Sequence, residues 1–173
     1  MILFVRHGQS ECNDKKIIQG QLDSPLNCIG IDQANITAKL LKNEKIEIIY
    51  TSPLARASKT AEIINQYHNV PIIKDDRLKE QNAGEATGRN EDSITKEEYE
   101  DFMKDPHKYN AENEEDLYKR NVEFFKEIEN SNKNILIVSH RGVWKSLYKY
   151  VNNLPLSSKI EKIENCEVKV LKK

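Results

Sequence analysis

The chain has 173 residues, of which 38% are hydrophobic and 32% are charged, a composition typical of an ordinary soluble globular protein. This length suits one domain, residues 1–173, with a substantial core. The 27 lysines and arginines nearly balance the 28 acidic residues, and the formal net charge of −1 argues against non-specific binding to nucleic acid or to an anionic membrane. Positive charge needed for function must therefore be concentrated locally.

The elements predicted along the chain alternate between strands and helices. They are, in chain order, a strand at Ile2–Val5, a helix at Gly30–Lys42, a strand at Ile46–Tyr50, a helix at Leu54–Tyr67, a strand at Val70–Lys74, a helix at Asp116–Glu129, a strand at Ile135–Ser139, a helix at Val143–Val151 and an edge strand at Cys166–Leu171. The first four strands are short apolar runs typical of buried parallel strands. This alternation predicts an α/β three-layer sandwich with a mainly parallel sheet flanked by helices.

Two segments carry further expectations. The helix at Gly30–Lys42 is expected to bury one apolar face, made of Ile31, Ala34, Ala38 and Leu41. The acidic stretch at about 90–115 is expected to leave the core with one or two short helices. It is either a lid beside a functional site or a solvated surface.

The cysteines and the N-terminus predict the compartment. Cys12, Cys28 and Cys166 are odd in number and form no CxxC pair, as expected of a reduced intracellular protein. No apolar run approaches the roughly 18 residues of a membrane span. Only four apolar residues separate Met1 from Arg6, too few for a secretory signal. We therefore expect a cytoplasmic protein without a membrane or nucleic-acid partner.

Charged side chains follow the predicted parallel strands. The four strands lead, in chain order, to Arg6-His7-Gly8, to Thr51-Ser52-Pro53 with Arg56, to Glu80, and to Ser139-His140-Arg141-Gly142. In open α/β sheets ligands bind beyond the carboxyl ends of the strands, so these groups should converge on one rim. Guanidinium groups match the charge and geometry of a phosphate monoester, and a neutral histidine is a competent nucleophile toward phosphorus. The set predicts a phosphate site.

Five ordered blocks resemble the histidine phosphatase superfamily, which includes the cofactor-dependent phosphoglycerate mutases. The blocks are RHGQSECN, QGQLDSPLNCIG, YTSPLARASKTAEII, RLKEQNAGEATG and ILIVSHRGV, and they cover most of the chain in the family's order. The resemblance implies a phosphoglycerate mutase-like fold, in agreement with the pattern of elements. It also implies phosphoryl transfer through phosphohistidine without a metal or another cofactor.

Roles for individual residues follow from the resemblance by matching position. His7 would be the nucleophile, and Arg6, Arg56 and His140 would form the phosphate pocket. Glu80 would be the proton donor, with Glu85 as the competing carboxylate. Further substrate contacts are expected at Asn13, Gln19, Gly20 and Arg141.

The chain departs from the family's pattern at three places. Arg141 stands where a second glycine often follows the catalytic histidine, so it either adds a cation near the substrate or points outward. Gln81 and Asn82 follow Glu80, where mutases usually carry a basic residue next. Ala111-Glu112-Asn113 replaces a GES string, which puts in doubt any substrate contact made there.

Phosphatase and mutase share the first half-reaction, so the catalytic residues alone do not separate them. A mutase needs additional cations for a bisphosphorylated intermediate, whereas Glu97, Glu98, Glu100 and Asp101 make the corresponding region acidic. The QGQLDSPL string also favours the phosphatase branch. We therefore expect a phosphomonoesterase acting on a small phosphorylated metabolite. The alternatives are a cofactor-dependent phosphoglycerate mutase and a non-catalytic phosphate-binding or scaffolding member.

Overall fold

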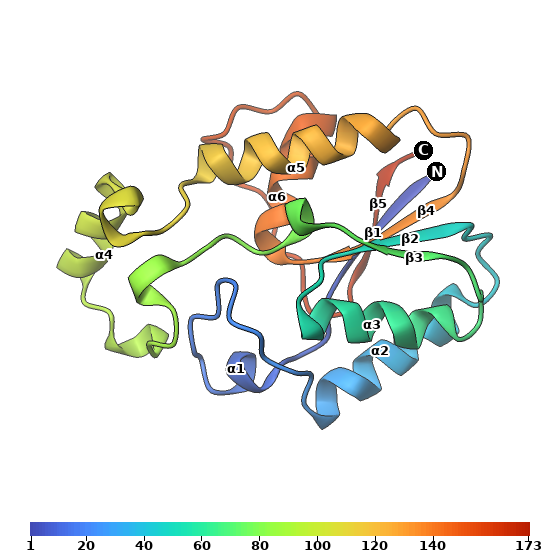
Figure 1. Cartoon of the computed structure of the whole chain (residues 1–173), viewed down its shortest axis with the longest axis horizontal. Helices are drawn as coiled ribbons and strands as arrows, with labels where there is room; N and C mark the ends of the chain where they lie inside the picture. Colours follow the sequence, from blue (N-terminus) through green and yellow to red (C-terminus); the bar gives the residue numbers. More distant parts are fainter.

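A five-stranded sheet forms the centre of the computed structural model, which describes all 173 residues (Figure 1). Its strands are β1 (Ile2–Arg6), β2 (Ile48–Thr51), β3 (Ile72–Lys74), β4 (Ile135–Ser139) and β5 (Val168–Lys172). The strand order is β3-β2-β4-β1-β5; the first four are parallel, and β5 pairs antiparallel with β1. The predicted α/β fold with a mainly parallel sheet is confirmed.

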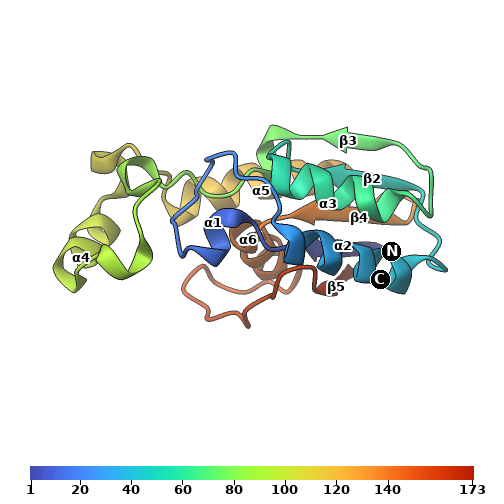
Figure 2. The ribbon, with the colours of Figure 1, turned by 90° about the horizontal axis from the view of Figure 1, so that it is seen from below.

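Helices cover both faces of this sheet (Figures 1 and 2). On one face lie α2 (Cys28–Leu41) and α3 (Ala55–Asn65), and on the other lie α5 (Glu114–Ile128) and α6 (Arg141–Val151). Side chains of a strand alternate between faces, so β1 contributes Phe4 to the cluster with Phe125 and Leu147, and Val5 to the cluster with Ala38. The central strands are therefore buried on both sides.

The register between the two central strands places the catalytic candidates. In the parallel pair β1–β4, Arg6 lies opposite Ser139, so His7 and His140 both follow at the carboxyl edge. The backbone N–H of His7 donates to the carbonyl of Ser139 at 2.9 Å. The chain first runs outward from β1 to β2 and β3 and then returns to insert β4 beside β1. The site lies where this strand order reverses.

Two expectations about burial are wrong. Ile31 is 40% exposed, because Gly30 and Thr37 accompany Ala34, Ala38 and Leu41 on the buried face of α2. The third strand is shorter than expected and half-exposed, because β3 is an edge strand that pairs only with β2. The other helices and strands lie within a few residues of the expected bounds, and β5 is the predicted edge strand.

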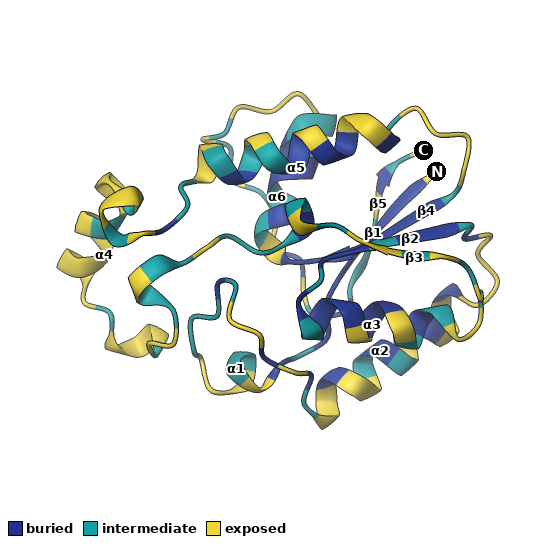
Figure 3. Ribbon diagram, in the orientation of Figure 1, coloured by how far each residue is buried: buried dark blue, intermediate teal, exposed yellow.

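The segment between β3 and α5 begins against the core, where Leu78 is buried, and then extends away from the sheet (Figures 1 and 3). It contains 3-10 turns at Asp76–Leu78, Gly84–Ala86, Glu91–Ser93 and Pro106–Tyr109, and the short helix α4 (Lys96–Lys104). Figure 3 shows α4 largely exposed, and none of its residues is buried. The remaining short helix is α1 (Glu11–Asp14), directly after the first charged block. None of the helices is both long and apolar enough to cross a membrane.

Candidate active site

His7 follows β1 and is only 3% exposed. Its Nδ1 lies 2.7 Å from the carbonyl oxygen of Gly8, which can only accept a hydrogen bond, so Nδ1 carries a proton. Burial, and after it the charges of Arg56 and Arg6, lower the pKa of His7 well below its ordinary value. The imidazole is therefore neutral near pH 7, with the lone pair of Nε2 available as a nucleophile.

His140 follows β4 and is fully buried beside His7, with the two ring centroids 5.0 Å apart. Burial, and after it the charge of Arg56, lowers the pKa of His140 well below its ordinary value. Its Nε2 lies 2.8 Å from the Ser52 hydroxyl, which accepts from the Leu54 N–H and has its own hydrogen free to donate. In that tautomer the proton of His140 is on Nδ1, which has no hydrogen-bond partner in the protein.

Two buried arginines border the histidines. Arg6 donates to the carbonyl of Ile163 at 2.9 Å, and Arg56 donates to the carbonyls of Leu22 and Gly20 at 2.7 and 2.8 Å. Each keeps a buried Nε–H without a partner in the protein. Burial lowers the pKa of both, but a guanidinium group stays charged at neutral pH. Carbonyl contacts thus fix two cations whose remaining donors are free for an anion.

The Glu80 carboxylate is the acidic group of this cluster. Its charge raises the pKa of both Arg6 and Arg56, against the effect of burial, so it acts on both cations. Oε1 accepts hydrogen bonds from the N–H of Gly142 at 3.2 Å and of Gln81 at 2.9 Å. Glu85, the competing carboxylate, is exposed and accepts from Asn110, outside this cluster.

The secondary site candidates lie in two groups. Asn13 closes a capping box with Ser10 at the start of α1, and the hydroxyl of Ser10 also donates to Gln19 at 2.8 Å. Gly20 contributes its carbonyl to Arg56. Asn13 in α1 is thus linked through Ser10 to Gln19 and Gly20, which lie in the loop that binds Arg56. Arg141 is exposed at the first position of α6, and its charge contributes to the lowered pKa of Arg6.

Several residues to which the sequence analysis gave no role support the site. Ser52 positions the ring of His140, and the hydroxyl of Thr60 accepts the N–H of Gly8 at 3.1 Å. Both belong to the YTSPLARASKT block, which was the available signal. Gly142 leaves room for the Glu80 carboxylate, because a β-carbon there would collide with Oε1. Arg120 binds the backbone of Glu80 and had no signal in the sequence.

The residues Ala111, Glu112 and Asn113 make contacts within the protein that stabilise its structure. Ala111 is buried, Asn113 caps α5 by accepting the N–H of Asp116 at 2.8 Å, and Glu112 pairs with Arg120. The string thus belongs to the junction between the excursion and α5. No three His, Cys, Asp or Glu side chains come together as a metal-binding group.

Comparison with known proteins identifies the family of the chain. The model of the histidine phosphatase superfamily (branch 1) matches residues 2–172. The chain is 38% identical over 141 residues to a Bacillus subtilis protein named uncharacterized phosphatase PhoE, covering 80% of this chain and 70% of PhoE. It is 33% identical to phosphoserine phosphatase 1 of Hydrogenobacter thermophilus over 155 residues, covering 85% and 74% of the two chains.

Solved structures and mutase-named relatives complete the comparison. The structure of Bacillus stearothermophilus YhfR superimposes with a TM-score of 0.85 at 30% identity, covering 96% of this chain and 88% of that one. Other relatives are named as phosphoglycerate mutases, among them GpmB of Photorhabdus laumondii. GpmB is 46% identical over 97 residues, which is 56% of this chain and 45% of GpmB.

Proposed function

Because this chain belongs to branch 1 of the histidine phosphatase superfamily and its relatives include phosphatases, we propose that it hydrolyses a small phosphorylated metabolite through a phosphohistidine at His7. The observation that carries the proposal is a neutral, oriented His7 beside three buried nitrogens without protein partners. These are Nε of Arg6, Nε of Arg56 and Nδ1 of His140. Three such donors match the oxygens of one phosphoryl group.

In the first step Nε2 of His7 attacks phosphorus as the bond from phosphorus to the ester oxygen breaks. Arg6, Arg56 and His140 stabilise the negative charge on the non-bridging oxygens. An alkoxide is a poor leaving group, so Glu80, whose carboxylate takes up a proton as the substrate binds, donates that proton to the departing oxygen. The products are the free alcohol, a phosphohistidine and the Glu80 carboxylate.

In the second step the Glu80 carboxylate takes a proton from water. The water oxygen attacks phosphorus, and the bond between phosphorus and Nε2 of His7 breaks. Inorganic phosphate leaves, and neutral His7 and the protonated Glu80 are regenerated. The same carboxyl group thus acts as acid and then as base, as microscopic reversibility allows.

Hydrolysis of p-nitrophenyl phosphate in the presence of EDTA tests the proposal. We expect turnover, an acid-labile phosphoenzyme on rapid quenching, and loss of both in His7→Ala. Absence of turnover and of a phosphoenzyme across about pH 5–8 would support the scaffolding alternative. Full activity of His7→Ala would show that another group is the nucleophile.

The substrate class follows from the size of the charge cluster. One phosphoryl group accounts for Arg6, Arg56 and His140, and Arg141 is available for a second anionic group. A phosphorylated carboxylic acid such as phosphoserine fits this set, consistent with the name of the Hydrogenobacter relative. Phosphate release from a panel of phosphoserine, 3-phosphoglycerate, sugar phosphates and α-ribazole phosphate tests this choice. A clear preference for a neutral sugar phosphate would contradict it.

The similarity to GpmB keeps mutase activity as the second candidate. The acidic residues of α4 are partly paired, Glu98 with Arg89 and Asp101 with Lys108, so their repulsion is weaker than the composition alone implies. Isomerisation of 3-phosphoglycerate with 2,3-bisphosphoglycerate present separates the two activities. We expect phosphate release to exceed isomerisation.

A further inference from the structure

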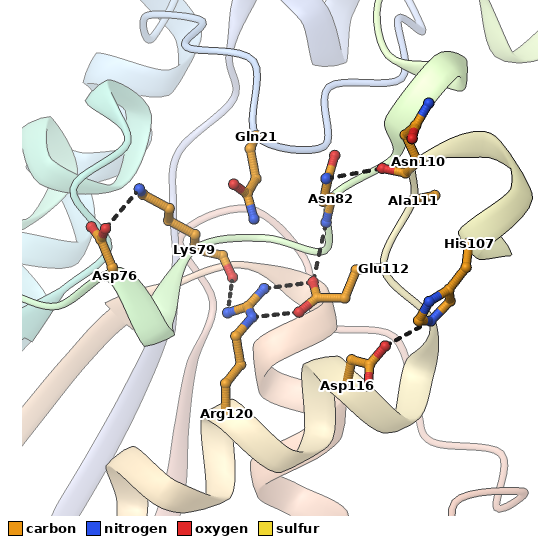
Figure 4. Close-up of a pocket in the computed structure, with 10 residues that line it drawn as sticks. All are labelled: Gln21, Asp76, Lys79, Asn82, His107, Asn110, Ala111, Glu112, Asp116 and Arg120. Carbon is orange, nitrogen blue, oxygen red and sulfur yellow. Dashed lines mark hydrogen bonds and ion pairs between the residues drawn. The ribbon is translucent and has the colours of Figure 1, made fainter.

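A polar cavity of about 440 Å³ lies between α5 and the segment that carries Glu80 (Figure 4). Nine of its ten lining residues are polar or charged. Its ionisable groups already contact one another within the protein: Lys79 with Asp76 at 3.0 Å, His107 with Asp116 at 2.8 Å, and Arg120 with Glu112 at 2.6 Å. The cavity therefore presents little free charge to a ligand, and its pairs instead connect the surrounding elements.

Arg120 makes the densest set of contacts in this region. Figure 4 shows its side chain extending from α5 toward the segment of Lys79. Nη1 donates to the carbonyls of Arg77 and Lys79 at 2.7 and 2.8 Å, and Nη2 donates to the carbonyl of Glu80 at 3.0 Å. One guanidinium group thus holds three carbonyls at and before the proposed acid.

Glu112 fixes the other side of the same guanidinium group. Its two carboxylate oxygens accept from Nε and Nη2 of Arg120 at 2.6 and 2.8 Å, the bidentate geometry of a strong ion pair. Glu112 also contacts the segment itself, since its Oε2 accepts the N–H of Asn82 at 3.2 Å and its carbonyl accepts from Gln81 at 2.7 Å. The Arg120 and Glu112 side chains are only 20% and 15% exposed, so solvent screens the pair little.

The segment depends on these contacts because it belongs to no strand or helix. Residues 79–83 have no sheet partner, and their backbone groups are bound by side chains from three other parts of the chain. The first two parts carry Arg120 and Glu112, and the third carries Gln21, whose side chain donates to the carbonyl of Glu80 at 3.1 Å. Without such contacts a loop of this kind would sample several backbone conformations.

We propose that Arg120 and Glu112 are positioning residues that hold the Glu80 carboxyl in line with the leaving oxygen of the substrate. The inference rests on the proposed function, in which Glu80 is the acid. In this assignment neither residue binds the phosphate; Arg120 fixes the backbone of Glu80, and Glu112 orients Arg120. Displacement of a catalytic group by about 1 Å can cost on the order of 100-fold in rate.

The test uses leaving groups of different basicity. The proton from Glu80 matters most for an alkyl phosphate, whose alkoxide is strongly basic, and least for p-nitrophenyl phosphate, whose phenolate leaves readily. The kcat/KM value reports the steps up to formation of phosphohistidine, so it isolates this proton transfer. We expect Arg120→Lys to lower kcat/KM for an alkyl phosphate by ~10- to 100-fold and to affect p-nitrophenyl phosphate far less. Glu80→Gln, which removes the proposed proton donor, shows how kcat/KM depends on the leaving group when the acid is absent.

Glu112→Gln is the milder variant, and it keeps the proposal testable if Arg120→Lys does not fold. It keeps the size of the side chain and leaves Arg120 in place, so it should show the same leaving-group dependence with a smaller amplitude. Because the two residues act as one unit, the double variant should lose little more than Arg120→Lys alone.

Arg77→Lys is the matched control. Arg77 also joins the Asp76–Leu78 turn to α5, through Glu127 at 2.6 Å, but its side chain makes no hydrogen bond to residues 79–82. It should change thermal stability without altering the ratio of the two kcat/KM values. A general structural effect would instead lower kcat/KM for both substrates by the same factor in Arg120→Lys, Glu112→Gln and Arg77→Lys.

The outcomes are distinct. Inactive wild-type protein overturns the proposed function itself. In a second outcome the wild type is active and Glu80→Gln shows the leaving-group dependence, but Arg120→Lys and Glu112→Gln fold and do not show it. This result is compatible with the proposed function and overturns the positioning role. A Glu80→Gln variant without that dependence also overturns the inference, because the pair would then position no acid.

Discussion

At Gly142 the fold gives Glu80, the proposed acid, the space that a side chain would otherwise occupy. A β-carbon there would collide with Oε1 of Glu80 and lie 3.0 Å from a methyl carbon of Leu117. The Glu80 side chain is flexible and can move aside, and alanine is the better helix former in α6. We therefore expect Gly142→Ala to lower kcat/KM for an alkyl phosphate by ~10-fold or more while the free energy of unfolding changes by less than about 1 kcal/mol. Steady-state kinetics and urea denaturation measure the two effects, and unchanged kinetics would contradict the contact.

The lowered pKa values of His7 and His140 have a consequence for stability. Burial holds both rings neutral in the folded protein, whereas in the unfolded chain each has a pKa of about 6.5. As the pH falls below that value the unfolded state binds protons first, so protonation favours unfolding. Each histidine should therefore cost stability as the pH falls through this range, by at most about 1.4 kcal/mol between roughly pH 7.5 and 5.5.

Urea denaturation of the wild type and of the His7→Gln/His140→Gln variant measures this cost. The variant should lose less stability over that pH range by up to about 2.7 kcal/mol, because it lacks both titrating rings. The loss of stability of each single variant should lie midway between that of the wild type and that of the double variant. Parallel pH profiles for wild type and double variant would show that the rings are protonated in the folded state as well.

At the scale of elements, α5 connects the excursion to the site. Asn113 caps its first turn by accepting the N–H of Asp116, and one turn later α5 carries Arg120. Loss of an N-cap usually costs about 1 kcal/mol. We expect Asn113→Ala to lower the free energy of unfolding by about this amount, measured by urea denaturation, with Asn113→Ser largely restoring it. Equal losses in both variants would instead assign the cost to the contact between Asn113 and His107.

Strands and helices with a clear local sequence pattern could be predicted, whereas their order in the sheet and their long-range contacts could not. The runs at β1 and β4 are short, apolar and followed by charged residues, so the sequence alone predicted both strands and the convergence of His7 with His140. The edge position of β3 depends on strand order, which periodicity does not reveal. Arg120 lies 40 residues after Glu80 and meets it only through the path of the excursion, so no spacing could have predicted that contact.

At the scale of the whole molecule, the site belongs to the most buried part of the sheet. β1 and β4 are buried along their full length and contribute to the apolar clusters on both faces. His7 and His140 directly follow these two strands, so the proposed phosphate pocket is built on the centre of the fold. An anion that binds the pocket should therefore stabilise the molecule as a unit rather than one loop.

Thermal unfolding in inorganic phosphate measures this coupling. A ligand that binds only the folded state stabilises it by about 2.7 kcal/mol at 100 times its Kd, which for a chain of this length corresponds to a rise in Tm of roughly 5–10 °C. We expect Tm to rise with the logarithm of phosphate concentration above the Kd. The rise should be strongly reduced in Arg6→Gln, because the variant retains the strand but lacks one of the two guanidinium groups. Arg89→Gln, on the excursion, should respond as the wild type does. An equal rise in Arg6→Gln, or in chloride at matched ionic strength, would mean that phosphate acts as a general salt and not as a ligand of the pocket.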